Sequence, residues 1–361
     1  MTNAKILRKD EFETIFGNKE EMKDFVTNIV SESKWDTFPC GDIEVKRCDP
    51  VDMDTLQNSG LAVTINGKDY ALGKSAVAGL FQTARVSGPA LGVLLREGDF
   101  DTLTDILNKC IRTDKKNERQ YLFRNDKIRA FHSKTYRVVE SNEILDAFCE
   151  EMDNIGTFEH GIYTQEEMSA TYDINDDEVK ESYAKVLSSY LGPVEKDKVN
   201  ADVMLVTSDT ANSGCNLYYN VRCGKNEMVL GCGIKMAHKG NASMDKFRDN
   251  LSKVLSSYKK SMKNVMDLQL IDIRFPDGCF LNLAKKCDLP MEVAKNCAVS
   301  FADIVGNKCT ALEVYILGLS SILSACRQES KYGNRQLLVI QEKIARALNL
   351  DFKKYDNPYN K

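Results

Sequence analysis

The sequence holds few side chains that could serve acid–base or nucleophilic catalysis. Its three histidines are His132, His160 and His238, and a Ser/His/Asp or Cys/His site would have to use one of them. Any of the 12 cysteines could supply the nucleophile, so no specific pairing is indicated. His132 and His238 each lie in a strongly basic stretch, where an imidazole assists anion binding or caps a strand. We therefore predict no catalytic residue.

Two short segments match part of a phosphate-binding motif or of a nucleophile motif. Gly73-Lys74-Ser75 ends like a nucleotide-binding loop, which needs Gly, four residues and then Gly-Lys-Ser/Thr to wrap a phosphate. Gly67 precedes this string by one residue too many, and a hairpin turn already requires it. The Ser-x-x-Lys string that begins at Ser243 falls at an expected helix start, where Ser243 or Asn241 is a cap. Neither string predicts a cofactor.

Two sets of residues could ligate a metal ion. Cys215, Cys223, Cys232 and His238 are spaced too loosely for structural zinc, and the chain has no C-x-x-C pair. The carboxylates Asp202, Asp209 and Asp272 lie in or just beyond expected strands, where a metal-dependent nuclease would build its site. Acids at strand ends also form turns. We predict no metal site, and we keep the nuclease as a third hypothesis of function.

Two basic stretches, separated by an acidic one, are the main functional signal. Residues 109–137 and 222–263 each carry 10 Lys or Arg side chains against three carboxylates, whereas residues 140–181 are acidic with Lys180 as the only cation. In one interpretation the basic stretches converge on one face and bind phosphates. In the other, basic and acidic segments face each other and cancel.

The first interpretation predicts a specific set of contacts to nucleic acid. Aromatic residues close to the basic stretches, including Tyr121 and Phe123, could stack on bases. The predicted phosphate contacts are Arg129, His132, Lys134, Tyr136, Arg137, Arg222, Lys225, Lys235, His238 and Lys239, with Tyr218 or Tyr219 stacking on bases.

The elements that would position these residues are mixed. Asn66-Gly67 is the strongest hairpin signal, because both residues tolerate the positive φ of a two-residue turn. Strands are expected at 42–48, 61–65, 68–72, 127–131, 136–139, 202–207, 216–222, 227–236 and 268–273. Helices are expected within 9–33, from 75, and at 102–111, 142–151 (capped by Asn142), 176–191, 243–266, 290–304, 310–328 and 335–348.

This order predicts an α+β fold with a central, largely antiparallel sheet, flanking helices and a helical C-terminal part. Strands do not alternate regularly with helices, which argues against a doubly wound sheet. A division into residues 1–192, with the hairpin near 61–72, and residues 193–361 is compatible with the chain, as is a single domain.

Composition is that of an ordinary globular protein: 361 residues, 43% hydrophobic, 28% charged and a net charge of −4. The chain contains no apolar run of the roughly 20 residues that a membrane helix needs, and its first residues lack the pattern of a signal peptide. We therefore expect a cytoplasmic protein without a membrane partner, in which the cysteines are reduced core residues.

Two segments resemble a known family. Arg129 to Val139, followed by Asn142, is similar to the "R-A-F-(L)-S-(D/K)-x-Y-R-x-(V/L)-(D/E)-N" segment of a phage- and plasmid-borne family catalogued as domain of unknown function nine-three-two. Residues 203–240 resemble a second segment of that family. The matching strings there are Thr207-Ser208-Asp209, Cys223-Gly224-Lys225-Asn226 and His238-Lys239-Gly240.

The resemblance departs from the family pattern in two places. Asp209 replaces a glutamate, and the family's Cys-Thr-Asn-Gly turn is scrambled. The match covers the middle of the chain only. It implies a mobile-element setting, and it supplies no catalytic residues.

These observations lead to three hypotheses. The first is a non-enzymatic nucleic-acid-binding protein of a phage or plasmid, acting on single strands in recombination or replication. The second is a protein-binding inhibitor of a host defence system, whose acidic residues 140–181 would occupy a basic groove meant for nucleic acid. The third is the nuclease. The partner is thus nucleic acid or a host defence protein, and a homo-oligomer is compatible with the sequence.

Overall fold

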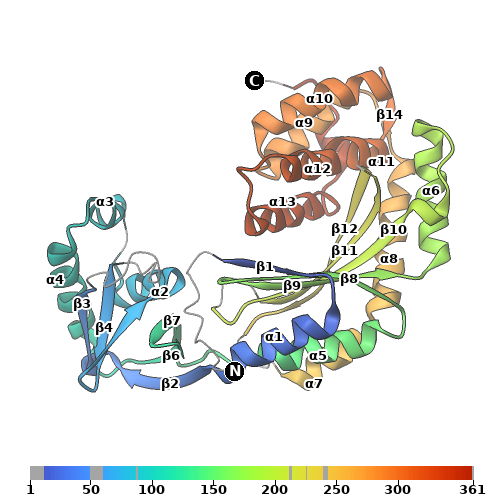
Figure 1. Ribbon diagram of the computed structural model, residues 1–361. Helices are drawn as coiled ribbons and strands as arrows, with labels where there is room; N and C mark the ends of the chain where they lie inside the picture. Colours follow the sequence, from blue (N-terminus) through green and yellow to red (C-terminus); the bar gives the residue numbers. More distant parts are fainter. Residues whose placement is uncertain are drawn as a thin grey trace.

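The computed structural model describes residues 12–48, 60–86, 88–210, 214–224, 226–238 and 243–359. It confirms the predicted α+β class with largely antiparallel strands and a helical C-terminal part. The strands build two six-stranded sheets rather than one central sheet (Figure 1). We call them sheet I and sheet II.

Sheet I is formed by strands between residues 33 and 133. In spatial order its strands are β2 (Ser33–Pro39), β6 (Glu118–Arg124), β7 (Lys127–Ser133), β5 (Lys68–Leu72), β4 (Leu61–Ile65) and β3 (Ile43–Arg47). Only the β7–β5 pair is parallel. Three helices accompany this sheet: α2 (Lys74–Ala84), α3 (Pro89–Glu97) and α4 (Phe100–Ile111).

Two tight turns lie at the same end of sheet I. The predicted Asn66-Gly67 hairpin is confirmed, with φ of 50° and 76° at its two residues. Asn125 and Asp126 join β6 to β7 with φ of 50° and 60°. Positive φ at both central residues is the mark of the primed turns that match the twist of a hairpin. Lys68 Nζ donates to Asp126 Oδ1 at 2.8 Å and so links the two turns.

Sheet II contains the middle of the chain and is antiparallel throughout. Its strands, in spatial order, are β1 (Glu13–Phe16), β8 (Gly156–Thr164), β9 (Met168–Ile174), β10 (Asn200–Thr207), β11 (Cys215–Cys223) and β12 (Asn226–Met236). The helices beside it are α1 (Lys19–Ser31), α5 (Ser141–Met152), α6 (Asp177–Leu191), α7 (Met244–Leu251) and α8 (Val254–Met266). Figure 1 shows α1, α5 and α7 together on one side of this sheet.

The C-terminal helices lie on the other side of sheet II, over β11 and β12 (Figure 1). They are α9 (Pro276–Lys286), α10 (Met291–Val305), α11 (Ala311–Glu313), a π-helical turn (Val314–Leu319), α12 (Ser320–Gln328) and α13 (Asn334–Ala347). A two-stranded ribbon of β13 (Asp272–Ile273) and β14 (Cys309–Thr310) accompanies them. Hydroxyl groups anchor the helices to the sheet: Tyr315 donates to the carbonyl of Val229 and Tyr218 to the Glu342 carboxylate, each at 2.6 Å.

Two separate hydrophobic cores support the two sheets. The smaller one packs sheet I against α2 and α4, and the larger one packs sheet II against its helices and the C-terminal part. Cys149, Cys279 and Cys326 are buried in the larger core, as predicted for cysteines that serve as core residues. Burial raises the pKa of the Cys279 thiol to about 12, so this thiol stays protonated at neutral pH. Among the described helices, none is long and apolar enough to cross a membrane.

Several predicted elements differ from the structure. Residues 13–16, assigned to an N-terminal helix, form β1 on the edge of sheet II. Residues 136–139 are not a strand, because the chain turns after β7 with the Tyr136 N–H bonded to the Ser133 carbonyl. Asn142 does not cap α5, which begins one residue earlier. The helix expected over 243–266 is two helices, and the first half of the strand expected over 268–273 is a helical turn. Residue 192, where one of the two domain alternatives places a division, lies between β9 and β10, which pair directly in sheet II.

The two sheets meet through a buried ion pair. Arg124, the last residue of β6, pairs with the carboxylate of Asp209, which follows β10, and also donates to Ser33 Oγ at 2.8 Å. The Arg124 side chain is only 5% exposed and that of Asp209 18%. Burial alone would lower the pKa of this guanidinium, but the Asp209 carboxylate and Tyr163 raise it above its ordinary value. Arg124 therefore remains charged at the junction of the sheets.

A stack of four rings continues the junction. Consecutive centroids of Trp35, His132, Tyr136 and His238 are 4.0 to 5.5 Å apart. His132 Nε2 lies 3.3 Å from the Asp209 carbonyl, and the Arg137 N–H donates to the His238 carbonyl at 3.0 Å. Burial lowers the pKa of His132 to about 4 and also lowers that of His238. Both imidazoles are therefore neutral at pH 7.

We predict that Asp209→Ala destabilises the protein by roughly 3–5 kcal/mol, because it leaves the Arg124 guanidinium buried without its carboxylate. The double variant Arg124→Met, Asp209→Leu should recover most of this loss, since it removes both charges and keeps the volume filled. Urea unfolding at neutral pH measures both effects.

The matched control is the exposed pair of Lys134 and Glu118, where Glu118→Ala should cost at most about 1 kcal/mol. An Asp209→Ala variant as stable as this control would contradict the role assigned to the buried pair.

Candidate nucleic-acid interface

The two basic stretches of the sequence do meet in space, but they do so inside the junction. His132 and Tyr136 from the first stretch pack against His238 from the second, and all three are buried. Arg129 is also buried, with 4% of its surface exposed. Lys134 and Arg137 are the predicted contacts of this region that face solvent, and Lys134 Nζ is bonded to Glu118 at 2.5 Å.

The predicted residues of the second stretch are spread over sheet II. Tyr219 is fully buried, with its ring centroid 5.1 Å from that of Tyr258. Tyr218 is buried beneath α13, and Lys235 Nζ lies 3.6 Å from Glu342, the partner of the Tyr218 hydroxyl. Neither tyrosine presents a ring face to solvent. Lys225 and Lys239 lie outside the described residues.

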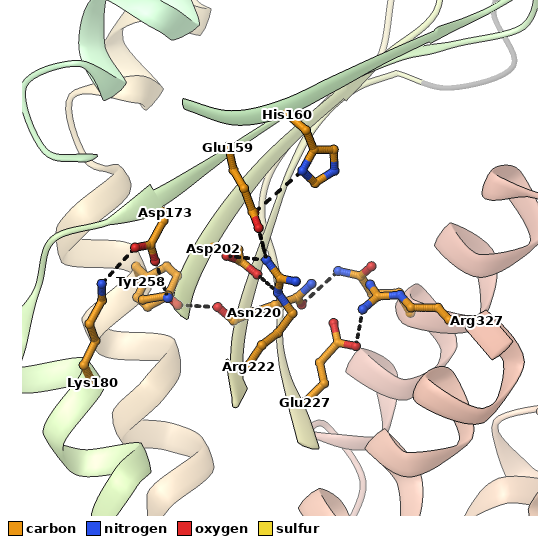
Figure 2. Close-up of polar contacts among 12 residues, drawn as sticks. Glu159, His160, Asp173, Lys180, Asp202, Asn220, Arg222, Glu227, Tyr258 and Arg327 are labelled. Atoms are coloured by element: carbon orange, nitrogen blue, oxygen red, sulfur yellow. Dashed lines mark hydrogen bonds and ion pairs between the residues drawn. The ribbon is translucent and has the colours of Figure 1, made fainter. Parts of the chain in front are cut away.

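Arg222 is held by two carboxylates on the face of sheet II that points towards α12 and α13. Figure 2 shows its guanidinium between Glu159 and Asp202. Nη2 lies 2.8 Å from both Glu159 oxygens and 3.2 Å from Asp202 Oδ1, and Nε pairs with Asp202 as well. Burial raises the pKa of the Asp202 carboxyl to about 6, although Arg222 lowers it. Arg222 is thus paired with two carboxylates of the protein itself, Glu159 and Asp202.

The acidic segment pairs with the second basic stretch. Glu150 bonds Arg248 at 2.9 Å, Glu159 bonds Arg222, and Lys259 lies 2.9 Å from both Asp176 and Glu178. The interpretation in which opposite charges face each other and cancel describes these contacts. The charge runs therefore do not form one continuous basic or acidic face here.

The three aspartates of the nuclease hypothesis lie apart. Asp202 is bound to Arg222 and Asp209 to Arg124, whereas Asp272 is exposed in β13. The described part of the chain contains no group of three or more His, Cys, Asp or Glu side chains placed to hold a metal ion.

A different place in the structure does combine rings with cations. A hollow of about 450 Å³ lies at the turn end of sheet I. Phe38 from β2, Tyr70 from β5 and Phe123 from β6 contribute half-buried aromatic rings to its lining. Lys34 and Lys68 stand at its edge with 74% and 57% of their side chains exposed. We call this site the aromatic hollow.

Strand register brings these side chains together. Lys34 lies directly opposite Phe123 in the antiparallel β2–β6 pair, and side chains of directly opposed residues share a face. The Phe123 ring meets Tyr70 at 4.9 Å and Phe38 at 6.2 Å, both edge to face. Lys68 Nζ lies 4.9 Å from the centroid of the Tyr70 ring. The rings form a connected cluster with cations beside it.

The cations of the aromatic hollow have carboxylate neighbours. Lys34 Nζ bonds Asp36 at 2.9 Å, and Lys68 Nζ bonds Asp126 at 2.8 Å. The hydrogen-bonded carboxylates raise the pKa of both ammonium groups, so both are charged at neutral pH. Exposed pairs of this kind contribute little to stability, so each lysine can exchange its carboxylate for another anion. Arg124, whose side chain pairs with Asp209, is also one of the residues that line the hollow.

Sequence reasoning identified only part of this site. Phe123 lies in a basic stretch of the sequence, whereas Phe38 lies outside both basic stretches and Tyr70 is expected only as part of the strand at 68–72. The alternation of Lys34, Asp36 and Phe38 along one strand face is the signal that was available.

Comparison of the chain with protein-family models, curated proteins and solved structures finds no match. The chemistry of the aromatic hollow is therefore argued from its own residues.

The raised pKa of Asp202 predicts a pH dependence of stability. The folded protein binds a proton at Asp202 more tightly than the unfolded chain, whose ordinary pKa is 3.8. Stability from this site is therefore present below about pH 4 and lost as the pH rises to about 6. The unfolding free energy of the wild type minus that of Asp202→Asn should fall by up to about 3 kcal/mol over this range and then stay constant.

Urea unfolding of both proteins in a pH series measures this difference. A difference that rises with pH would mean that Arg222 holds the pKa of Asp202 below its ordinary value, and it would contradict the assignment.

Proposed function

We propose that this protein binds single-stranded nucleic acid without catalysing a reaction on it, and that the aromatic hollow is the binding site. The proposal is carried by one observation, the cluster of Phe38, Tyr70 and Phe123 with Lys34 and Lys68 at its edge. Rings beside cations bind single strands because every base offers a π face and every nucleotide a phosphate. The ligand proposed from the sequence is thus retained, but the residues proposed to bind it are different.

The position of the rings favours single strands over duplexes. Phe38, Tyr70 and Phe123 are half-buried in the hollow, so a base must leave its stack to reach them. Lys34 and Lys68 would exchange Asp36 and Asp126 for backbone phosphates. Because each exchange breaks an ion pair, we expect binding that is weak per nucleotide and sensitive to salt.

The biological setting is proposed from the sequence. The resemblance of the segment Arg129 to Val139 to a phage- and plasmid-borne family supports a role in the replication or recombination of a mobile element, within the cytoplasm. Lys134 and Arg137, which belong to this segment, follow β7 at the end of the strand opposite to the aromatic hollow. They are therefore suited as controls for the site.

We predict that Phe123→Leu lowers the affinity for a labelled oligothymidylate by about tenfold, because a leucine packs in the core but cannot stack on a base. The double variant Lys34→Gln, Lys68→Gln should also reduce the slope of log affinity against log salt by about 1.4, or about 0.7 for each phosphate contact. Fluorescence anisotropy across a salt series measures both quantities.

Two further variants sharpen the test. Asp36→Asn with Asp126→Asn should tighten binding, since it releases both lysines from their carboxylates. Arg137→Glu with Lys235→Glu, which tests the site expected from the sequence, should leave the affinity unchanged. If the wild type binds no oligonucleotide at low salt, the proposed function is wrong. If only the Arg137→Glu, Lys235→Glu variant loses binding, the aromatic hollow is not the binding site.

A further inference from the structure

A second hollow, of about 290 Å³, lies between sheet II and the helices α12 and α13. Strands β8 to β11 form one wall, and α12 and α13 contribute the other with Arg327, Leu337, Leu338 and Gln341. Figure 2 shows Arg327 reaching from its helix towards the strands that carry Asn220 and Arg222. We call this site the sheet II groove. It shares no lining residue with the aromatic hollow.

Polar side chains from both walls meet in the sheet II groove. Gln341 Nε2 donates to Asn220 Oδ1 at 2.9 Å, and this bond uses neither the Asn220 amide N–H nor the Gln341 amide oxygen. Both side chains are nine-tenths or more buried. Arg327 engages Glu227 through Nη1 alone, so its Nε and Nη2 can also donate. The groove thus offers donors and an acceptor close together.

Both arginines of the sheet II groove are paired with carboxylates. Arg222 lies between Glu159 and Asp202, and Arg327 bonds Glu227 at 2.6 Å. A phosphate or carboxylate would compete with these carboxylates for the two guanidinium groups, and a carboxylate that it displaced would be left buried and unpaired. A ligand without a net charge meets no such cost.

The remaining lining is apolar and comes from both walls. Ile162 and Met204 belong to the sheet, whereas Leu337 and Leu338 belong to α13. Apolar walls with a few placed polar groups are typical of sites for small molecules, and the volume is at the lower end for such sites. A flat ring fits this lining because its faces are apolar and its edges carry donors and acceptors.

We infer that the sheet II groove binds a neutral heterocycle the size of a nucleoside. Its ring faces would lie between the side chains of the sheet and those of α13, and its edge would bond Asn220, Gln341 and Arg327. This inference is independent of the proposed function, because the two sites lie on different sheets.

Met204 provides a direct test, because its methyl group reports on the sheet II groove. The full-length protein, labelled with ¹³C at methionine methyl groups, is titrated with adenosine, guanosine, cytidine and thymidine in turn, up to low-millimolar concentration. At least one nucleoside should shift the Met204 resonance, assigned with Met204→Leu, in a saturable way. The Met22 resonance, from a residue fully buried in the larger core, should not move.

Three variants locate the binding. Ser169→Trp, on the sheet wall of the groove, should abolish the shift by filling the space, whereas Thr157→Trp, at an exposed β8 position outside the lining, should preserve it. Gln341→Leu keeps the helix packed but removes the edge partner, and it should weaken binding about tenfold.

Absence of a saturable shift with all four nucleosides would overturn the inference, as would a shift that persists in Ser169→Trp. Binding of oligothymidylate to Ser169→Trp should match that of the wild type. A tenfold loss of oligothymidylate affinity in Ser169→Trp would mean that the sheet II groove binds the oligonucleotide. This result would overturn its role as a separate site. Oligonucleotide binding by the wild type without any nucleoside shift would overturn this inference and leave the proposed function intact.

Discussion

The buried ion pair between Arg124 and Asp209 is the contact on which the arrangement of the two sheets depends. It joins the end of β6 to the turn after β10, and the rings of Trp35, His132, Tyr136 and His238 pack beside it. A charge placed in a buried environment is tolerated only with its partner, so the pair fixes one relative position of the sheets. Arg124 also follows Phe123 directly in β6 and is one of the residues that line the aromatic hollow.

The pairing of opposite charges decides where the protein can bind a ligand. Cations of the second basic stretch face carboxylates of the acidic segment, as Lys259 faces Asp176 and Arg222 faces Glu159. What distinguishes the aromatic hollow is therefore the set of rings within reach of exposed lysines, rather than an excess of positive charge. The sheet II groove is the complementary case, in which paired charges frame a space suited to a neutral ring.

Local chemistry made part of this structure predictable. Asn66-Gly67 specified its hairpin because the turn needs positive φ, and Asp176 marked the start of α6 because its side chain accepts from the Val179 N–H. The three strands expected after residue 200 are present as β10, β11 and β12. Such features depend on a few neighbouring residues, and their physics is contained in the sequence around them.

The site was harder to predict because it is made by contacts between distant residues. Arg124 and Asp209 are 85 residues apart, and nothing near either one indicates the other. Arg129 and His132 have the composition of a surface contact, but they belong to a strand that is buried between its neighbours and the junction. β8 and β9 were missed because their acidic and polar residues obscure the alternation. Most of the predicted contacts that the structure describes are buried, and burial depends on the whole fold rather than on neighbouring residues.

The most direct test of the account is to map where a nucleic acid touches the protein. An oligonucleotide containing photoreactive 5-iodouracil is crosslinked to the wild type, and the modified peptides are identified by mass spectrometry. The account predicts crosslinks to peptides that contain Phe38, Tyr70 or Phe123. Crosslinks confined to the lysines of α7 and α8, or to the segment around Lys134 and Arg137, would contradict it.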